Sequence, residues 1–112
     1  MPKRRAERSL TGAALLFAAL GDPTRLALIK QLSSGGPASI SALADRQWMT
    51  RQGVTKHLRV LADAGIIDGT RQGRELVWTL NPQRLAEGRR HIDIIAAGWE
   101  QALDRLKLLL EQ

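Results

Sequence analysis

Residues 50–67, TRQGVTKHLRVLADAGII, have the pattern of a helix with two chemically different faces, and this segment constrains the fold more than any other. Its apolar residues recur at steps of four and three, which places them on one side of a helix: Val54, Leu58 and Leu61. The polar stripe opposite follows the same helical spacing and comprises Gln52, Thr55, Lys56 and Arg59. Thr50 can cap the first turn, and Gly65 can end the helix in the left-handed conformation. The pattern predicts a helix that packs through one face and leaves the other free.

Two helices are predicted ahead of this segment. In GDPTRLALIKQLSSGG, residues 21–36, Asp22 is a good N-cap, Pro23 suits the first helical position, and the closing glycines stop the helix. The SISALADRQ that follows has apolar residues at helical spacing, and either Ser39 or Ser41 can cap it. A tight connection then leads into the two-faced helix.

The residues after that helix change to β-strand character. Residues 66–70 and 76–80 are short runs of the kind that form strands, and Gln72-Gly73 between them favours a turn. The sequence therefore predicts a two-stranded hairpin. Its tip carries two basic residues, Arg71 and Arg74.

The two ends of the chain are predicted to behave differently. Residues 1–10 are basic with few apolar groups, which indicates a flexible tail, and residues 11–112 form a single domain. The run over residues 11–20 is nearly apolar all round, as in a helix that is buried or lies at an interface. A last helix is predicted at about residues 88–110, with glycines at 88 and 98 that favour a bend or a break.

This last helix carries an apolar stripe that so small a chain has little means to bury by itself. Dimerisation through the first and last helices is the expected remedy. The predicted dimer interface comprises Leu16, Leu20, Ile95, Trp99, Leu103 and Leu106.

The formal net charge of +6 and the sequence pI near 11.1 favour a polyanionic partner, because lysine and arginine neutralise phosphates. The basic surplus lies within residues 1–80, whereas residues 81–112 are balanced. The chain contains no cysteine, which excludes disulfides and thiolate metal sites. The apolar run near the N-terminus lacks a cleavage site of the signal-peptide kind, so we expect a cytoplasmic protein.

The order of helix, short turn, helix and basic hairpin is that of a winged helix-turn-helix, a mainly α fold with a small β-hairpin. In such a motif the second helix enters the major groove of DNA. Gln52 can then pair with adenine, while Lys56 and Arg59 read guanine or bind phosphate. The predicted DNA-binding residues are Thr50, Arg51, Gln52, Thr55, Lys56, His57, Arg59, Arg71, Gln72 and Arg74.

Three blocks of the sequence together resemble the ArsR/SmtB family of bacterial winged-helix transcriptional repressors: LFAALGDPTRLALIKQL, ISALADRQWMTRQGVTKHLRVLADAGII and RQGRELVWTL. The resemblance covers about residues 13–108. It implies a dimer held by the first and last helices, a recognition helix at about residues 51–64 and a wing at about residues 66–80. It also implies a homodimeric repressor that occupies an operator, which two-fold symmetry would make an imperfect inverted repeat.

The metal-binding motifs of that family are missing here. Many members that metals release from DNA use a cysteine pair in the helix before the recognition helix or a D-x-H…H-x-x-E/H set on the last helix. This chain has no cysteine, and it has Ala102 where a second histidine would stand. A weaker alternative joins Glu87 and His91 to Asp93 or Glu100 of a partner. We therefore predict no metal and no cofactor, and leave the effector open among an organic molecule, a protein and none.

The aromatic residues allow two interpretations. Trp48, Trp78, Trp99 and Phe17 can line an apolar effector pocket or serve as core and interface anchors, and the second is the prediction.

Two other function classes fit the sequence less well. An enzyme is not expected, because SSGGPAS lacks the Gly-Lys-Ser/Thr of a phosphate-binding loop and no credible Ser/His/Asp set is present. The alternative is a winged-helix module that binds protein or RNA. Salt-dependent, sequence-selective binding to duplex DNA would distinguish a DNA-binding regulator from such a module.

Overall fold

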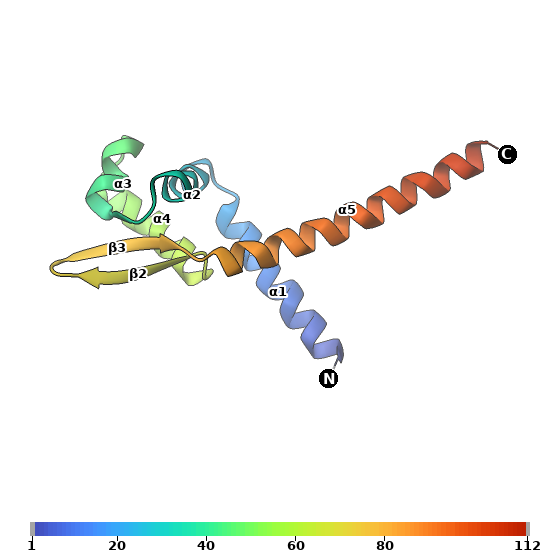
Figure 1. Ribbon diagram of the computed structural model, residues 1–112, viewed down its shortest axis with the longest axis horizontal. Coiled ribbons are helices and arrows are strands. Elements are labelled where there is room, and N and C mark those ends of the chain that lie inside the picture. Colours follow the sequence, from blue (N-terminus) through green and yellow to red (C-terminus); the bar gives the residue numbers. More distant parts are fainter. Residues whose placement is uncertain (1, 112) are drawn as a thin grey trace.

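The computed structural model describes residues 2–111, with side chains from residue 10 onward, as a small helical body from which one long helix projects (Figure 1). In chain order the elements are α1 (Pro2–Leu20), α2 (Pro23–Gly35), β1 (Ala38–Ser39), α3 (Ile40–Gln47), α4 (Arg51–Asp63), β2 (Ile67–Gln72), β3 (Glu75–Leu80) and α5 (Pro82–Leu110). The predicted mainly α fold with a β-hairpin is confirmed. Among the described residues no one helix has the length and apolarity of a membrane crossing, although residues 10–20 and 23–35 meet both criteria when taken together across their 95° bend.

Short polar side chains fix where the helices begin. The carboxylate of Asp22 accepts a hydrogen bond from the Arg25 amide at 3.0 Å, and the hydroxyl of Thr50 accepts one from the Gly53 amide at 3.0 Å. Of the two candidate caps for α3, Ser39 is the one used. These bonds satisfy backbone amides that have no partner within a helix, so they place α2, α3 and α4 at defined starting residues.

The core lies where α4 meets the helices before it and the root of the sheet. Val54, Leu58 and Leu61 of α4 are each 0% exposed, as their spacing predicts. Gly65 adopts φ +76° and turns the chain from α4 into β2. The remaining core residues come from α1, α2, α3 and the start of β2, and are Leu16, Ala19, Leu28, Leu32, Leu43, Ala44, Ile66 and Ile67.

The sheet has three antiparallel strands in the order β1-β3-β2, one more than predicted. The additional strand, β1, is only two residues long, and its Ala38 pairs with Trp78 of β3. A strand this short has no alternating pattern from which the sequence could predict it. The turn of the hairpin lies at Gly73-Arg74, one residue later than the predicted Gln72-Gly73. Gln72 instead ends β2, opposite Glu75. The hairpin projects from the body as a wing (Figure 1).

Both terminal helices are longer than predicted. α5 begins at Pro82, well before residue 88, because the Asn81 side chain accepts hydrogen bonds from the amides of Gln83 and Arg84. It continues through both glycines without a break. α1 begins at Pro2, so the backbone is helical over residues 2–10, where a flexible tail was predicted; Lys, Arg, Ala and Glu there all have good helix propensity. Met1 lies outside the described residues.

Gly88 has a packing role and does not bend α5. A Cβ atom there would lie 2.9 Å from a methyl carbon of Leu16, which is buried on α1. The absence of a side chain lets α1 and α5 approach closely. Gly98 has no atom within 4 Å of the corresponding position.

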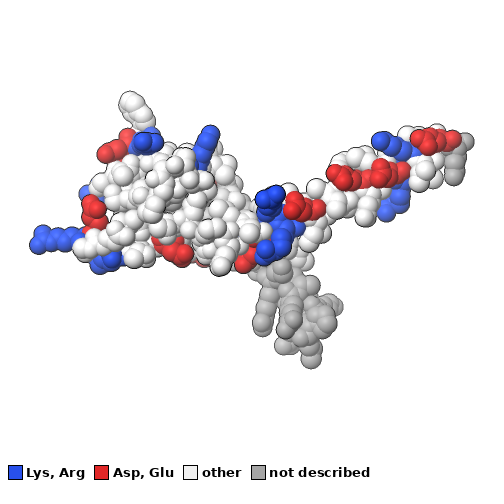
Figure 2. All heavy atoms as spheres, in the orientation of Figure 1, with Lys and Arg blue, Asp and Glu red and all other residues white. Residues whose placement is uncertain are grey.

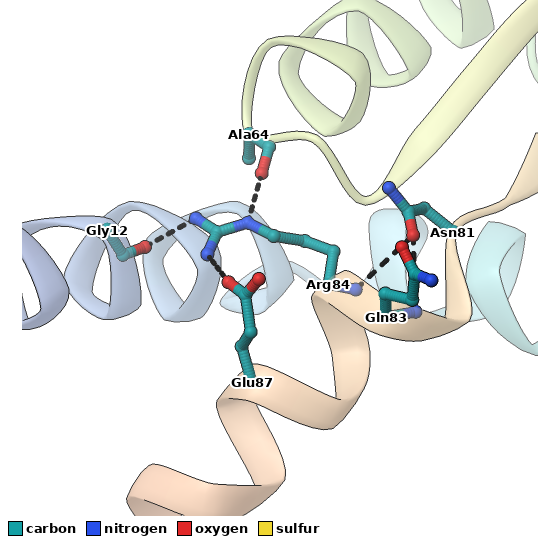
Figure 3. A network of polar contacts seen from close by, with 6 residues as sticks. All are labelled: Gly12, Ala64, Asn81, Gln83, Arg84 and Glu87. Atoms are coloured by element: carbon teal, nitrogen blue, oxygen red, sulfur yellow. Dashed lines mark hydrogen bonds and ion pairs between the residues drawn. The ribbon is translucent and has the colours of Figure 1, made fainter.

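Hydrogen bonds from Arg84 connect the contact between α1 and α5 to the end of α4 (Figure 3). Its guanidinium donates to the Gly12 carbonyl of α1 at 2.6 Å, to the Ala64 carbonyl after α4 at 2.8 Å, and to the Glu87 carboxylate at 2.7 Å. One side chain therefore joins α1, α5 and the α4–β2 turn.

Trp48, in the turn between α3 and α4, has a left-handed backbone (φ 54°, ψ 33°) and is 99% exposed. The expectation that it anchors the core is wrong for this residue. The turn needs a residue at positive φ that ends α3, and the reversal directs the side chain into solvent.

We expect Gly88→Ala and Gly98→Ala to change stability in opposite directions. Gly88→Ala should lower the free energy of unfolding by about 1–2 kcal/mol, because the new methyl group meets Leu16 in a packed crossing. Gly98→Ala should raise it by about 0.5–1 kcal/mol through helix propensity alone. Urea denaturation followed by circular dichroism at one protein concentration measures both. A similar gain for the two variants would contradict the close α1–α5 contact.

We expect Trp48→Asn to raise the free energy of unfolding by about 0.5–1 kcal/mol, because asparagine tolerates the left-handed region and no buried contact is lost. Trp48→Ala is the matched control, since it removes the ring and keeps the unfavourable φ. Thermal denaturation of both variants tests this. An equal increase in the free energy of unfolding for both variants would show that the exposed ring, and not the left-handed backbone, destabilises the wild-type protein.

Candidate nucleic-acid interface

The outer face of α4 presents the predicted polar stripe to solvent. Gln52, Lys56 and Arg59 are exposed, while the apolar side of the same helix is buried. Thr55 is half-buried, and its hydroxyl donates to the Arg51 carbonyl at 2.7 Å. This bond uses the hydroxyl proton, so Thr55 keeps only acceptor capacity and its methyl group for an external partner.

The N-terminal end of α4 forms a shallow, open depression. It is lined by Thr50, Arg51, Gln52, Gly53, Thr55 and Lys56. The Thr50 hydroxyl serves as the N-cap of α4, so its first role is to begin the helix. The structure thus brings together five of the predicted DNA-binding residues on one surface.

The wing carries the other basic residues of the predicted site. Arg71 lies near the end of β2 opposite Leu76, Arg74 lies in the turn, and both are exposed, as is Gln72. Figure 2 shows basic side chains projecting at the hairpin end of the molecule, with acidic side chains close by. The wing and the start of α4 meet at a cleft to which Arg51, Arg71 and Arg74 all contribute.

The same cleft includes Ser39 and Ser41, which the sequence analysis did not place in the site. Their only sequence signal was as possible caps of α3. The fold brings the start of α3 close to the wing. A serine in the sequence does not indicate that an arginine from a distant segment will lie beside it.

His57, which was predicted as a DNA-binding residue, lies away from the exposed stripe of α4. It is half-buried, with Nδ1 3.5 Å from a guanidinium nitrogen of Arg25 and 3.7 Å from the carboxylate of Asp22. One position along a helix turns a side chain by about 100°, which directs His57 away from its neighbour Lys56 and toward the α1–α2 corner. It therefore helps to fix α4 on the body.

Asp22 and Arg25 complete this contact. The backbone amide of Arg25 holds the pKa of the Asp22 carboxyl below its ordinary value, and the charges of Arg25 and His57 add to the effect. Arg25 also donates to the carbonyls of Ala18 and Ala19, which close the end of α1. These contacts of Asp22, Arg25 and His57 connect α4 to the end of α1 and the start of α2, on the side away from the exposed stripe.

α5 exposes a nearly continuous apolar surface along its projecting part. Four of the predicted interface residues are exposed there: Ile95, Trp99, Leu103 and Leu106. Leu20 is half-buried and packs against the core. Leu16 is 1% exposed, so it is a core residue of its own chain and was wrongly placed at the interface; the close α1–α5 crossing covers it.

The structure does not gather the aromatic residues into one pocket. Trp99 is 66% exposed on the projecting helix, far from Trp48 in the α3–α4 turn (Figure 1). Phe17 and Trp78 are partly buried against the core, and the Trp78 indole N–H is buried with no hydrogen-bond partner among the described residues. Within residues 2–111 no three His, Asp or Glu side chains are arranged to hold a metal ion.

Comparison with known proteins also identifies a helix-turn-helix domain in this chain. Residues 20–70 match a family model described as a helix-turn-helix domain. Two relatives come from Mycobacterium tuberculosis: the HTH-type transcriptional regulator NmtR is 36% identical over 69 residues, and the HTH-type transcriptional repressor SmtB is 33% identical over 96 residues. These alignments cover 62% and 84% of this chain, which spans 57% of the length of NmtR and 67% of that of SmtB.

Solved structures agree with this. An ArsR-like transcriptional regulator from Rhodococcus sp. RHA1 is 31% identical and superposes with a TM-score of 0.79, covering 89% of this chain and 93% of its own. A homodimeric winged helix-turn-helix DNA-binding domain from Mycobacterium bovis shares the fold at 20% identity, with a TM-score of 0.68 and coverage of 83% and 85%. The sequence identity over most of both chains, together with the two-faced α4 and the basic wing, shows that this chain belongs to the ArsR/SmtB family of winged helix-turn-helix transcriptional regulators.

Proposed function

We propose that this protein is a homodimeric repressor that binds an imperfect inverted-repeat operator in double-stranded DNA. The observation that carries the proposal is the division of α4: Val54, Leu58 and Leu61 are fully buried on one face. On the other face Gln52, Lys56 and Arg59 are exposed, beside a wing that carries Arg71 and Arg74. A helix held in this way can enter the major groove without rearrangement. Binding to chromosomal DNA would place the protein in the cytoplasm.

The chemistry of the exposed residues divides their roles. Gln52, one turn or less from the start of α4, has an amide that pairs with both the N6 and N7 positions of adenine. Lys56 and Arg59 can read guanine or neutralise phosphates. Arg51, beside the free amides at the helix N-terminus, is suited to a phosphate. Base reading would thus centre on Gln52.

The dimer rests on the projecting part of α5. Its exposed apolar residues run over several turns, and a second copy of the same helix is a partner of matching shape and polarity. The homodimeric relative from Mycobacterium bovis supports such an assembly. Two-fold symmetry would present two α4 helices about one turn of DNA apart, roughly 34 Å.

Gln52→Ala tests the base-reading role. We expect it to change the preferred bases at one position of each half-site and to weaken binding to the wild-type operator by about 1–3 kcal/mol. The measurement is selection of duplexes from a random pool, followed by titration of the selected sequence. Gln83→Ala, an exposed glutamine at the start of α5, is the matched control and should keep the wild-type preference.

Two results of that selection would count against the proposal. An unchanged preference in Gln52→Ala would remove Gln52 from base reading. Equally weak binding of wild type to every duplex, or a preference for RNA of the same sequence, would favour the alternative of a protein- or RNA-binding module.

Trp99→Ala tests the dimer. We expect the variant to lower the mass measured by light scattering at micromolar concentration, because a large aromatic side chain at an interface contributes about 2 kcal/mol or more. Trp48→Ala removes an equally large exposed ring from the other end of the molecule and should keep the wild-type mass. A wild-type mass for Trp99→Ala at all concentrations would exclude Trp99 as an anchor.

A further inference from the structure

The cleft between the wing and the starts of α3 and α4 gathers positive charge from parts of the chain that are distant in sequence. It has a volume of about 210 Å³. Its polar lining comprises Ser39, Ser41, Arg51, Arg71, Arg74 and Glu75. Three arginines and one glutamate thus line the cleft, which gives its lining an excess of two positive charges.

The side-chain donors of this cleft have no acceptor among the described residues. None of its three guanidinium groups forms an ion pair or a hydrogen bond with another residue in the part of the chain that the structure describes. The Ser39 hydroxyl accepts a bond from the Ala42 amide, so its own proton remains available. Planar guanidinium groups and hydroxyls together match the oxygens of a phosphate group.

The position of the cleft indicates where such a phosphate comes from. A helix in the major groove and a hairpin that reaches the neighbouring groove must lie on either side of the sugar-phosphate backbone that separates the two grooves. Arg51 is the first residue of α4, and Arg71 and Arg74 lie at the end of the wing. The cleft between them lies where this backbone would pass.

We propose that this cleft is a phosphate-binding site in which α3, α4 and the wing hold one phosphate group jointly. The phosphate is either a backbone diester of the operator, an assignment that rests on the proposed function, or the phosphate of a free small molecule. In both cases the bound group fixes the wing relative to α4. Ser41 and Glu75 thereby join the binding residues, the first as a donor and the second as an opposing charge.

The first experiment neutralises single operator phosphates by methylphosphonate substitution and measures affinity for wild type, Arg51→Ala and Arg74→Ala. In wild type, one position in each half-site should cost about tenfold in affinity, as for a charge-assisted hydrogen bond. The same substitution should cost much less in either variant, because both have lost a contact to that phosphate. Arg59→Ala, which does not line the cleft, should show the full wild-type cost.

The second experiment uses a change that should strengthen binding. Glu75→Gln removes the one carboxylate of the cleft and should raise operator affinity several-fold at low salt. Asp68→Asn makes the same charge change on β2 outside the cleft and should have a smaller effect. Equal effects would show that only net charge matters and would count against a local phosphate site.

A third experiment examines the free phosphate source and separates this inference from the proposed function. Pyrophosphate is titrated into the DNA-free protein and followed by ³¹P NMR. Saturable binding that is lost in Arg74→Ala supports a free ligand. If wild type selects a duplex but no phosphate couples to Arg51 and Arg74, and pyrophosphate does not bind, the cleft proposal is overturned while the function stands. If no duplex is selected, the proposed function fails and the pyrophosphate titration alone decides the cleft.

Discussion

The buried face of α4 is the constraint on which the rest of this molecule depends. A helix of 13 residues is barely stable alone in water, so α4 exists because Val54, Leu58 and Leu61 are completely buried. Each such side chain contributes about 1.5–3 kcal/mol on burial, which far exceeds the contribution of any one exposed contact. Because the apolar side alone holds the helix, the residues opposite need not stabilise the fold, and they remain hydrated and available. The contact of His57 with Asp22 and Arg25 fixes the rotation of α4 about its axis, so the same residues always face outward.

A second constraint connects α4 to the projecting helix. Arg84 bonds to carbonyls at the end of α4 and on α1, and Gly88 lets α1 pack closely against α5. In a two-fold dimer formed through α5, the distance between the two recognition helices would depend on the angle at which α5 leaves the body. That angle is set at the Arg84 and Gly88 contacts. A regulator that must match the pitch of DNA therefore needs this junction to be rigid, although Arg84 and Gly88 do not line the candidate DNA-binding surface.

The parts of the structure that the sequence predicted are those encoded by local patterns. Helix caps at Asp22 and Thr50, the two faces of α4 and the glycine turn at Gly65 depend on residues within one or two helical turns of each other. The failures involve partners distant in the chain. Leu16 was predicted as an interface residue because its burial depends on Gly88, which is distant in the sequence. His57 was predicted as a DNA-binding residue because its partner Arg25 lies 32 positions away. The two long-range contacts of Arg84 have no sequence signal, since their acceptors are the backbone carbonyls of Ala64 and Gly12. In the site, the arginines were found from their charge, whereas Ser41 enters only because the wing folds against the start of α3.

The two ends of the molecule present opposite surfaces, and together they argue for one assembly. The hairpin end has an excess of basic residues, and its guanidinium groups have no partner among the described residues. Residues 81–112 instead carry five acidic and five basic residues around exposed leucines, isoleucines and Trp99. The first surface repels a copy of itself, and the second favours one, because burying it removes apolar area from water at no cost in net charge. Association through α5 would therefore join the two copies through a surface separate from their basic ends. A polyanion long enough to reach both ends would compensate their charge, and two such ends on one rigid axis would bind it with the advantage of two linked contacts. A duplex with two half-sites meets that description, and a short anion does not.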